Sequence, residues 1–279
     1  RGAKINVRTK VVSAEQINGI WHLTLHSIID DAKRVVKAKM IVNAGGPWVE
    51  DIIQNKVRLN SSEGVRLVRG SHLITKKLYE HNKCYFFQGE DGRIIFTIPY
   101  ETDFTLIGTT DVEHFDISIK PECTLEEKKY LVNFASEYFE TKVTIDDIVK
   151  TYSGVRPLYN DNASSASAAT RDYVLSIDET LGAPILNVFG GKITTYRKLS
   201  ENALDKISKI LPKVGASWTA GVPLPGGDFN IEDLESLINK LSKKYNFLDQ
   251  KWALRLIKAY GTDAFELLGD CENSKDLGI

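Results

Sequence analysis

The residues best suited to chemistry are one histidine and several charged groups spread along a chain of 279 residues. His72 follows a glycine within a run of branched residues, and an imidazole with a pKa of about 6.5 can accept a proton at neutral pH. Arg156 precedes a proline, Arg171 opens a β-rich run, and Lys192 lies on a glycine turn. A guanidinium can hold a phosphate through two parallel hydrogen bonds, and a lysine adds a point charge. Asp111 ends a polar run that could hydrogen-bond a cofactor or close a hairpin; each of these residues, taken singly, could also be purely structural.

Two turns in which a strand meets glycines and then a helix form the second signal, at 42–48 and 188–192. Glycine lets a ligand approach the backbone, and the following helix presents unpaired N–H groups and the positive end of its dipole. Such a turn suits a phosphate or the anionic edge of a reduced flavin, although glycine also serves packing alone. Ile193 follows Gly191-Lys192, so the second turn is not a P-loop, and the chain contains no G-x-G-x-x-G.

Composition narrows the classes of protein to consider. Apolar residues make up 42% and charged residues 26%, as expected of a folded soluble chain. A net charge of −1 predicts no nucleic-acid partner, and no apolar run reaches the roughly 18 residues of a membrane span. Three cysteines without C-x-x-C spacing favour a reducing compartment and no metal site. Met40 is the only methionine, so we expect a piece of a longer protein.

The pattern of apolar residues predicts elements that would position these groups. A hairpin turn at Asn18-Gly19 joins strands at 4–14 and 20–28, and the run 34–42 ends as a buried strand before a helix with Pro47 near its start. Thr124 and Glu127 form a capping box for a helix reaching about residue 139. Further strands are expected at 65–74, 83–88, 93–99, 104–108, 148–157, 173–177 and 185–189, and helices at 194–211, 231–245 and 249–260.

The order of six motifs resembles that of the FAD-dependent glycerol-3-phosphate dehydrogenases of the aerobic, respiratory kind. A late P-L-P-G-G (223–227) and A-Y-G (259–261) extend the similarity to the family's helical C-terminal domain. The six motifs are V-N-A-G-G-P-W-V (42–49), R-L-V-R-G-S-H (66–72), I-G-T-T-D-V (107–112), Y-S-G-V-R-P-L (152–158), T-R-D-Y (170–173) and F-G-G-K-I-T-T-Y-R-K-L (189–199).

The resemblance implies a mixed α/β and α+β fold in four stretches. Residues 1–60 would be part of a glutathione-reductase-like FAD domain, with a β-meander, a strand and a helix. Residues 61–147 would form an antiparallel-sheet substrate domain with one helix. Residues 148–211 would return to the substrate and FAD domains, and 212–279 would begin a helical C-terminal domain.

The resemblance also implies an activity and roles for individual residues. Members oxidise sn-glycerol 3-phosphate to dihydroxyacetone phosphate by hydride transfer from C2 to flavin N5 of FAD, and electrons pass to membrane quinone. His72 and Arg156 would act at the C2 hydroxyl, and Arg171 and Lys192 would hold the phosphate. A cytoplasmic protein attached peripherally to the inner face of the membrane (or to a mitochondrial-type membrane), and a homodimer, are further expectations. The residues expected to bind FAD are Ala44, Gly45, Trp48, Gly190, Gly191, Lys192, Thr194 and Thr195.

The chain departs from the family pattern in ways that leave other readings open. It lacks the opening strand, G-x-G-x-x-G turn and helix that hold the FAD pyrophosphate, and a further substrate arginine of that portion. We therefore expect this polypeptide alone to bind FAD weakly or not at all and to be inactive, whereas its parent protein would be active. The alternatives are a glycerol-3-phosphate oxidase that uses oxygen, a catalytically inactive fragment, and an amine or amino-acid oxidase of the same fold.

Overall fold

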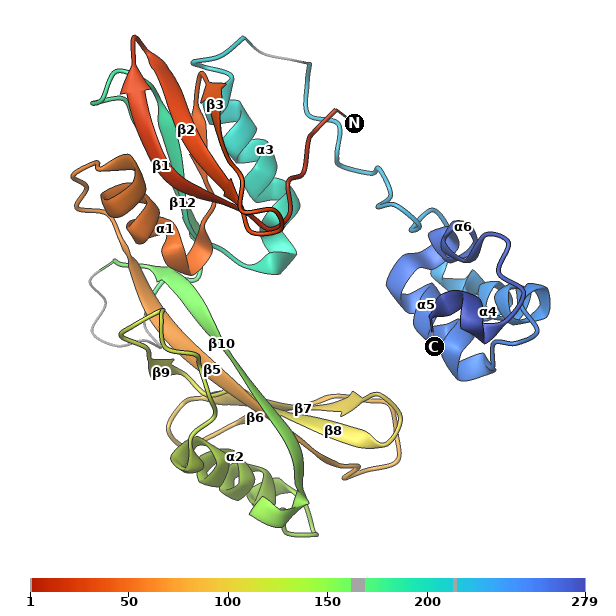
Figure 1. The fold of residues 1–279 in the computed structure, drawn as a ribbon. Helices are drawn as coiled ribbons and strands as arrows, with labels where there is room; N and C mark the ends of the chain where they lie inside the picture. The colour runs from red at the N-terminus through yellow and green to blue at the C-terminus, as the bar shows by residue number, and fades with distance from the viewer. Residues whose placement is uncertain (1, 162–168, 213–214, 279) are drawn as a thin grey trace. The chain divides into compact units, whose positions relative to one another are not determined.

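The computed structural model describes residues 2–161, 169–212 and 215–278. Two compact units divide the chain, Arg1–Lys213 and Val214–Ile279. The first holds three β-sheets, and the regular elements described in the second are helices (Figure 1). The expected mixed fold, with antiparallel sheets and few helices, is confirmed. Over the described ranges, no helix combines the length and the apolar character needed to cross a bilayer.

A three-stranded antiparallel meander opens the first unit, with β1 (Thr9–Ile17), β2 (Ile20–Ser27) and β3 (Lys33–Ala38). The predicted turn between the first two strands is confirmed, with positive φ angles at both Asn18 and Gly19. β1 begins later than the predicted residue 4, because its pairing starts where it meets the end of β2. The indole of Trp21 is completely buried and donates a hydrogen bond to the carbonyl of Pro184 (2.8 Å), which ties the meander to the second sheet.

The second sheet combines β11 (Tyr173–Asp178), β12 (Ile185–Gly190) and β4 (Ile41–Asn43), in that order. β12 runs antiparallel to β11 and parallel to β4. The predicted single strand over 34–42 is therefore wrong, since it splits between two sheets as β3 and β4. The prediction of a buried strand is also only partly right. Ile41 packs against the core shared with the meander, whereas Val42 points the other way and is 48% exposed.

Short helices follow both parallel strands. After β4 come a 3₁₀ turn (Gly46–Trp48) that carries Pro47 in its first turn, α1 (Val49–Asp51) and a π-helical turn (Ile52–Val57). After β12 come a 3₁₀ turn (Ile193–Thr195) and α3 (Tyr196–Ile207). The helix predicted to reach residue 211 ends earlier, because the N–H groups of Lys209 and Ile210 bond to carbonyls only three residues back.

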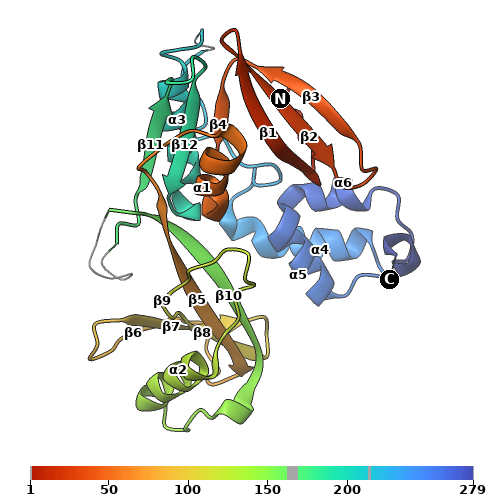
Figure 2. The same cartoon turned by 60° about the vertical axis from the view of Figure 1, so that its left-hand side comes forward.

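The third sheet is the largest and is antiparallel throughout, in the order β10-β5-β8-β7-β6. Helix α2 (Leu125–Tyr138) lies against one face of it (Figure 1, Figure 2) and shares a buried core with strand residues such as Leu73 and Ile107. The predicted capping box at the start of α2 is confirmed. The strands are β5 (Val65–Lys76), β6 (Tyr85–Gln88), β7 (Ile94–Tyr100), β8 (Phe104–Gly108), β9 (Val112–Glu113) and β10 (Ile148–Tyr159), with β9 paired to β5 and a 3₁₀ turn (Ile145–Asp147) before β10.

β10 carries one extra residue near its start. Ile148 faces Thr75 of β5, but Lys150 faces Ile74, so Val149 is a bulge with no partner in this ladder. Ile148 packs into the core beneath α2. The bulge reverses the alternation of β10 and so decides which of its side chains face away from α2.

The second unit packs α4 (Leu234–Lys244), α5 (Gln250–Tyr260) and α6 (Ala264–Leu268) around its own apolar core. Both longer helices fall within the predicted stretches 231–245 and 249–260, and α5 ends at Gly261 as predicted. The buried Tyr245 hydroxyl donates to the carbonyl of Gly269 (2.8 Å) and holds the end of α6. The remaining 3₁₀ turns are Ile231–Asp233, Gly261–Asp263 and Ser274–Leu277.

Candidate active site

The face of the large sheet that points away from α2 gathers the expected chemical groups. Side chains alternate between the two faces of a strand, so Tyr152, Gly154 and Arg156 of β10 share one face. Tyr152 stands directly opposite His72 of β5, and Gly154 stands opposite Gly70. The His72 imidazole and the Arg156 guanidinium therefore lie on the same face as Gly70 and Gly154.

His72 lies against Tyr152 and Gly108, with Arg156 nearby. Its ring stacks on that of Tyr152, with the centroids 4.8 Å apart and the planes 9° from parallel. A side chain on Gly108, the partner of His72 on β8, would overlap the imidazole, so glycine is required there. Nδ1 is enclosed without a hydrogen-bond partner among the described residues. Burial lowers the pKa of His72, and the positive charge of Arg156 lowers it further, so the ring is neutral at pH 7.

Arg156 is held by three consecutive residues that follow β8. Its Nη2 donates to the Thr109 hydroxyl (3.0 Å), and its Nη1 donates to the carboxylate of Asp111 (2.8 Å) and weakly to the carbonyl of Thr110 (3.4 Å). The guanidinium lies across Gly70, where a Cβ atom would overlap it. Burial lowers the pKa of Arg156, which the charge of Asp111 opposes, and the group remains a cation because its ordinary pKa lies so far above 7.

Asp111 joins Arg156 to the second expected arginine. Nη2 of Arg171 donates to the other carboxylate oxygen at 3.2 Å, and the Arg171 side chain is 42% exposed. Two positive charges thus share one negative charge. This leaves an excess of positive charge that could bind an anionic ligand. Arg171, Asp111 and Thr109 line a cleft of about 630 Å³ with the turn between β6 and β7 at 91–94.

The second glycine turn meets the strand that carries Arg156. A Cβ atom on Gly190 would meet the carbonyl of Asp172 and the backbone of β10, and both Gly190 and Gly191 have positive φ angles, which suit glycine. Lys192 is exposed, and its ammonium group makes no hydrogen bond or ion pair with the described residues. The structure thus brings His72, Arg156 and Arg171 together. Lys192 lies on the neighbouring glycine turn, but no contact joins its amine to these three residues among the described parts of the chain. Thr194 is exposed and Thr195 half-buried, on the 3₁₀ turn that follows.

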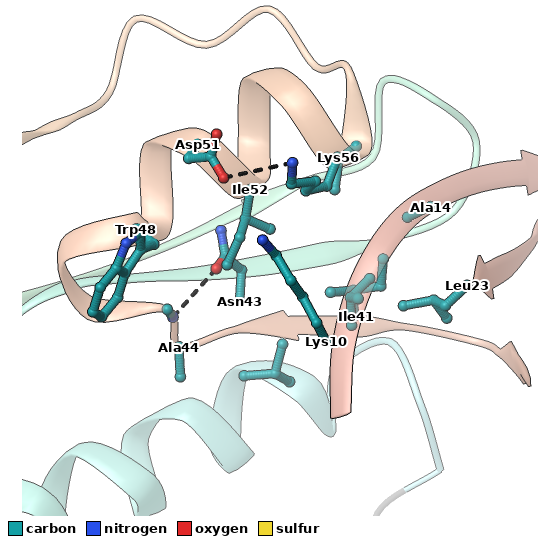
Figure 3. A pocket seen from close by; sticks show the side chains of 14 residues that line it. Lys10, Ala14, Leu23, Ile41, Asn43, Ala44, Trp48, Asp51, Ile52 and Lys56 are labelled. Atoms are coloured by element: carbon teal, nitrogen blue, oxygen red, sulfur yellow. Dashed lines mark hydrogen bonds and ion pairs between the residues drawn. The ribbon is translucent and has the colours of Figure 1, made fainter. Parts of the chain in front are cut away.

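The first glycine turn borders a pocket of about 420 Å³ between the meander and the helical turns after β4. Ala44, Gly45 and Trp48 all line it, so the structure brings these expected cofactor residues to one wall (Figure 3). Lys10 points into the pocket from β1, and Lys56 enters it while pairing with Asp51 (Figure 3). The two glycine turns follow β4 and β12, which are parallel neighbours, so both turns leave the sheet at its carboxyl end. Nδ2 of Asn43 donates to Oδ1 of Asn187 (3.0 Å) across these two strands.

Comparison with known proteins decides the family. Residues 1–197 match the family model described as FAD dependent oxidoreductase. The chain belongs to the FAD-dependent oxidoreductase family. It is 42% identical over 278 residues to a glycerol-3-phosphate dehydrogenase of Pseudomonas aeruginosa, covering 99% of this chain and 54% of that protein. It is 40% identical to the D-erythritol 1-phosphate dehydrogenase of Brucella abortus, covering all of this chain and 55% of that protein.

A solved structure agrees with these sequence matches. The Bacillus halodurans glycerol-3-phosphate dehydrogenase complexed with FAD superposes with a TM-score of 0.79 at 26% identity, covering 97% of this chain and 53% of that one. The resemblance seen in the motifs is confirmed along the whole chain. The chain spans about half the length of the relatives it matches.

The residues present fit the cofactor of this FAD-dependent family. Gly154 faces open space beside the Arg156 guanidinium, and Gly190 and Gly191 have the positive φ angles that bare glycine backbone allows. The pocket beside Trp48 offers an exposed indole and two ammonium groups, which suit the aromatic and phosphate parts of a dinucleotide. The residues that would hold FAD are therefore those of this pocket and of the two glycine turns.

Sequence reasoning left three residues out of the site. Asp111 was noted only as an ambiguous polar residue, although it bridges both arginines, and Thr109 and Tyr152 were not considered as site residues. Two-residue spacing in β10 could have pointed to Tyr152, since it shares a face with Arg156. No sequence signal links Asp111 to an arginine 60 positions away.

Proposed function

We propose that the intact gene product oxidises sn-glycerol 3-phosphate to dihydroxyacetone phosphate. The observation that carries this proposal is the pair of arginines joined by Asp111 beside a half-buried neutral imidazole. Such a set recognises an anion and accepts a proton at neighbouring positions, as a phosphorylated alcohol requires. Bound FAD would supply the acceptor for the hydride that leaves C2.

His72 is the proposed general base. Removing hydride from C2 requires that the hydroxyl proton be taken up, and an imidazole that is neutral at pH 7 can accept it. Nε2 is the nitrogen assigned to this step, because Nδ1 is enclosed. With Nε2 free to accept, the neutral ring carries its own proton on Nδ1. Tyr152 holds the ring plane by stacking.

The two arginines have different proposed roles. Arg156 is the proposed stabiliser of negative charge on the C2 oxygen, because its fork is fixed by Thr109 and Asp111. Arg171, which is more exposed and makes one longer hydrogen bond to the described residues, is the proposed phosphate ligand, with Lys192 as a second cation. Glycine turns at 45 and 190–191, together with Ala44, Trp48, Thr194 and Thr195, are the proposed cofactor contacts.

The partners of the reaction follow from the family resemblance. We propose membrane quinone as the electron acceptor, peripheral attachment to the cytoplasmic face of the membrane, and a homodimer. Oxygen consumption with and without a quinone analogue distinguishes the dehydrogenase from an oxidase. Rapid oxygen uptake without quinone would contradict this part of the proposal.

The test of the substrate is the flavin absorbance of the intact gene product, titrated anaerobically with glycerol 3-phosphate. We expect the oxidised flavin band to disappear with this substrate and to persist with glycerol, which lacks the phosphate. Persistence of the band with glycerol 3-phosphate would refute the proposal. D-erythritol 1-phosphate belongs in the same titration, because a relative named for that substrate is 40% identical and the cleft beside Arg171 is large.

A further inference from the structure

Behind the candidate site, on the α2 face of the same sheet, lies a buried carboxylate. Glu127 in the first turn of α2 is only 5% exposed. It accepts hydrogen bonds from the Thr110 hydroxyl (2.6 Å), the Ser71 hydroxyl (2.8 Å) and Nη2 of Arg69 (3.0 Å), besides the backbone N–H of Thr124 (3.0 Å). The capping of α2 accounts for just the last of these bonds. The other three fix two residues of β5 and Thr110, which follows β8, rather than the helix.

Thr110 connects this carboxylate to the opposite face. Its hydroxyl donates to Glu127 and accepts from the N–H of Ser71 (2.9 Å), so the residue is clamped between α2 and β5. Its two neighbours, Thr109 and Asp111, point to the other face and hold the Arg156 guanidinium, which also contacts the Thr110 carbonyl. Thr110, the middle of the three residues that contact Arg156, is therefore held by hydrogen bonds on the α2 face of the sheet.

Glu127 is well suited to this task because it stays ionised. Burial alone would raise the pKa of Glu127, but hydrogen bonds from Thr110, Thr124 and Ser71 and the charge of Arg69 outweigh burial and lower it. Hydrogen bonds to a charged acceptor are stronger than neutral ones. Ser71 extends the anchor to β10, because its hydroxyl also lies 2.8 Å from that of Ser153.

We propose that Glu127 is a positioning residue of the oxidation site, acting through Thr110 to hold Arg156 against His72. This inference rests on the role given to Arg156 under the proposed function. It makes α2, which touches none of the expected substrate residues, part of the machinery that orients the substrate-facing charge. Misplacing a catalytic group by about 1 Å can cost about 100-fold in rate.

The first experiment follows the Arg156 and His72 side chains by NMR in this chain, without substrate or cofactor. In Thr110→Val, which keeps the shape but loses the hydroxyl, we expect the slowly rotating Arg156 guanidinium signals to broaden and the pKa of His72 to rise. The pKa rises because Arg156, whose charge lowers it, is no longer held nearby. The titratable and charged groups facing His72 are Arg156 and Tyr152 from β10, since its β8 partner is Gly108.

Matched variants separate positioning from general damage. Thr110→Ser restores the hydroxyl and should restore both signals, and Glu126→Gln, on the exposed neighbour in the same helical turn, should change neither. Glu127→Gln should reproduce Thr110→Val. If Glu127→Gln fails to fold, the Thr110→Val and Thr110→Ser pair decides. A folded Thr110→Val chain with unchanged Arg156 and His72 signals would overturn the inference.

Kinetics in the intact gene product complete the test. We expect Thr110→Val to lower kcat about 100-fold while KM stays within about threefold, because Arg156 acts at the reacting carbon and not at the phosphate. Failure of wild type to oxidise glycerol 3-phosphate would contradict the proposed function but leave the NMR coupling intact. Normal kcat in Thr110→Val, alongside an active wild type, would contradict the positioning role alone.

Discussion

The two faces of the large antiparallel sheet are built on opposite principles. The face beneath α2 is closed: Leu73, Ile95 and Ile107 are fully buried. The carboxylate of Glu127 is also buried there and accepts several hydrogen bonds. The other, open face is more exposed to solvent. Tyr152 and Phe96 are more than 40% exposed there, and Nδ1 of the nearby His72 has no partner among the described residues.

This contrast separates the residues of one sheet into those that stabilise the fold and those that remain available to a ligand. The closed face gains from burial and hydrogen bonding, so its residues hold the strands in register. The open face leaves charges and an imidazole in places that are useful to a ligand and costly without one. Substitutions on the two faces should therefore be distinguishable by whether they change unfolding or ligand chemistry.

The largest effect on unfolding is expected from Ile107→Ala on the closed face. Removing a fully buried isoleucine leaves a cavity and should lower the free energy of unfolding by about 2–5 kcal/mol, measured by denaturant titration of this chain. Phe86→Ala on the open face, where the ring is 59% exposed, should cost about 1 kcal/mol. Equal losses from the two substitutions would break the comparison.

The largest effect on chemistry is expected from Arg156→Lys on the open face. Lysine cannot reproduce the planar fork held by Thr109 and Asp111, so kcat/KM for glycerol 3-phosphate should fall about 100-fold or more in the intact gene product. The melting temperature should change little. Arg34→Lys in the exposed meander is the control and should retain full activity. An active Arg156→Lys enzyme would remove this residue from the proposed mechanism.

A sharper version of the contrast uses the two glycines that face each other on the open side. Gly70→Ala places a methyl group where the Arg156 guanidinium lies, whereas Gly154→Ala adds one to open space. We expect the guanidinium NMR signals of Arg156 to move strongly in Gly70→Ala and hardly at all in Gly154→Ala. Similar spectra for both variants would show that the guanidinium is not held across Gly70.

The smallest effect is a pH dependence of stability that originates at His72. Folding lowers the pKa of this imidazole, mainly through burial, so the unfolded chain takes up the proton first as pH falls through about 6.5. The free energy of unfolding should therefore decrease as pH falls below about 7, until the folded chain is protonated too. His72→Gln should remove that component, seen as a flatter pH profile than wild type. An unchanged profile would place the titrating group elsewhere.

Local chemistry made much of the fold predictable. The Asn18-Gly19 turn, the Thr124–Glu127 capping box and the stop at Gly261 depend on neighbouring residues, and all three are confirmed. The division of residues 34–42 between two sheets was missed, because pairing partners far along the chain decide it. The same limit applies to helix ends such as that of α3, where tight three-residue bonds replace the last turn.

The candidate site was predictable in its residue types but not in its connections. Imidazole and guanidinium groups are visible in any sequence, so His72, Arg156 and Arg171 could be selected from their local contexts. Their link through Asp111 depends on how β8, β10 and the start of β11 meet, which no short-range spacing encodes. The same holds for Glu127, whose capping role is local but whose bond to Thr110 crosses between elements.

The unpaired Val149 in β10 has a consequence for how this site can tolerate changes in chain length. By simple alternation Ile148 would share a face with Arg156, and only the bulge lets one go into the core and the other toward the ligand. Deleting Val149 would leave a regular ladder with every partner unchanged. Deleting Val155, six residues later, would carry the guanidinium through to the α2 side, away from His72 and Asp111.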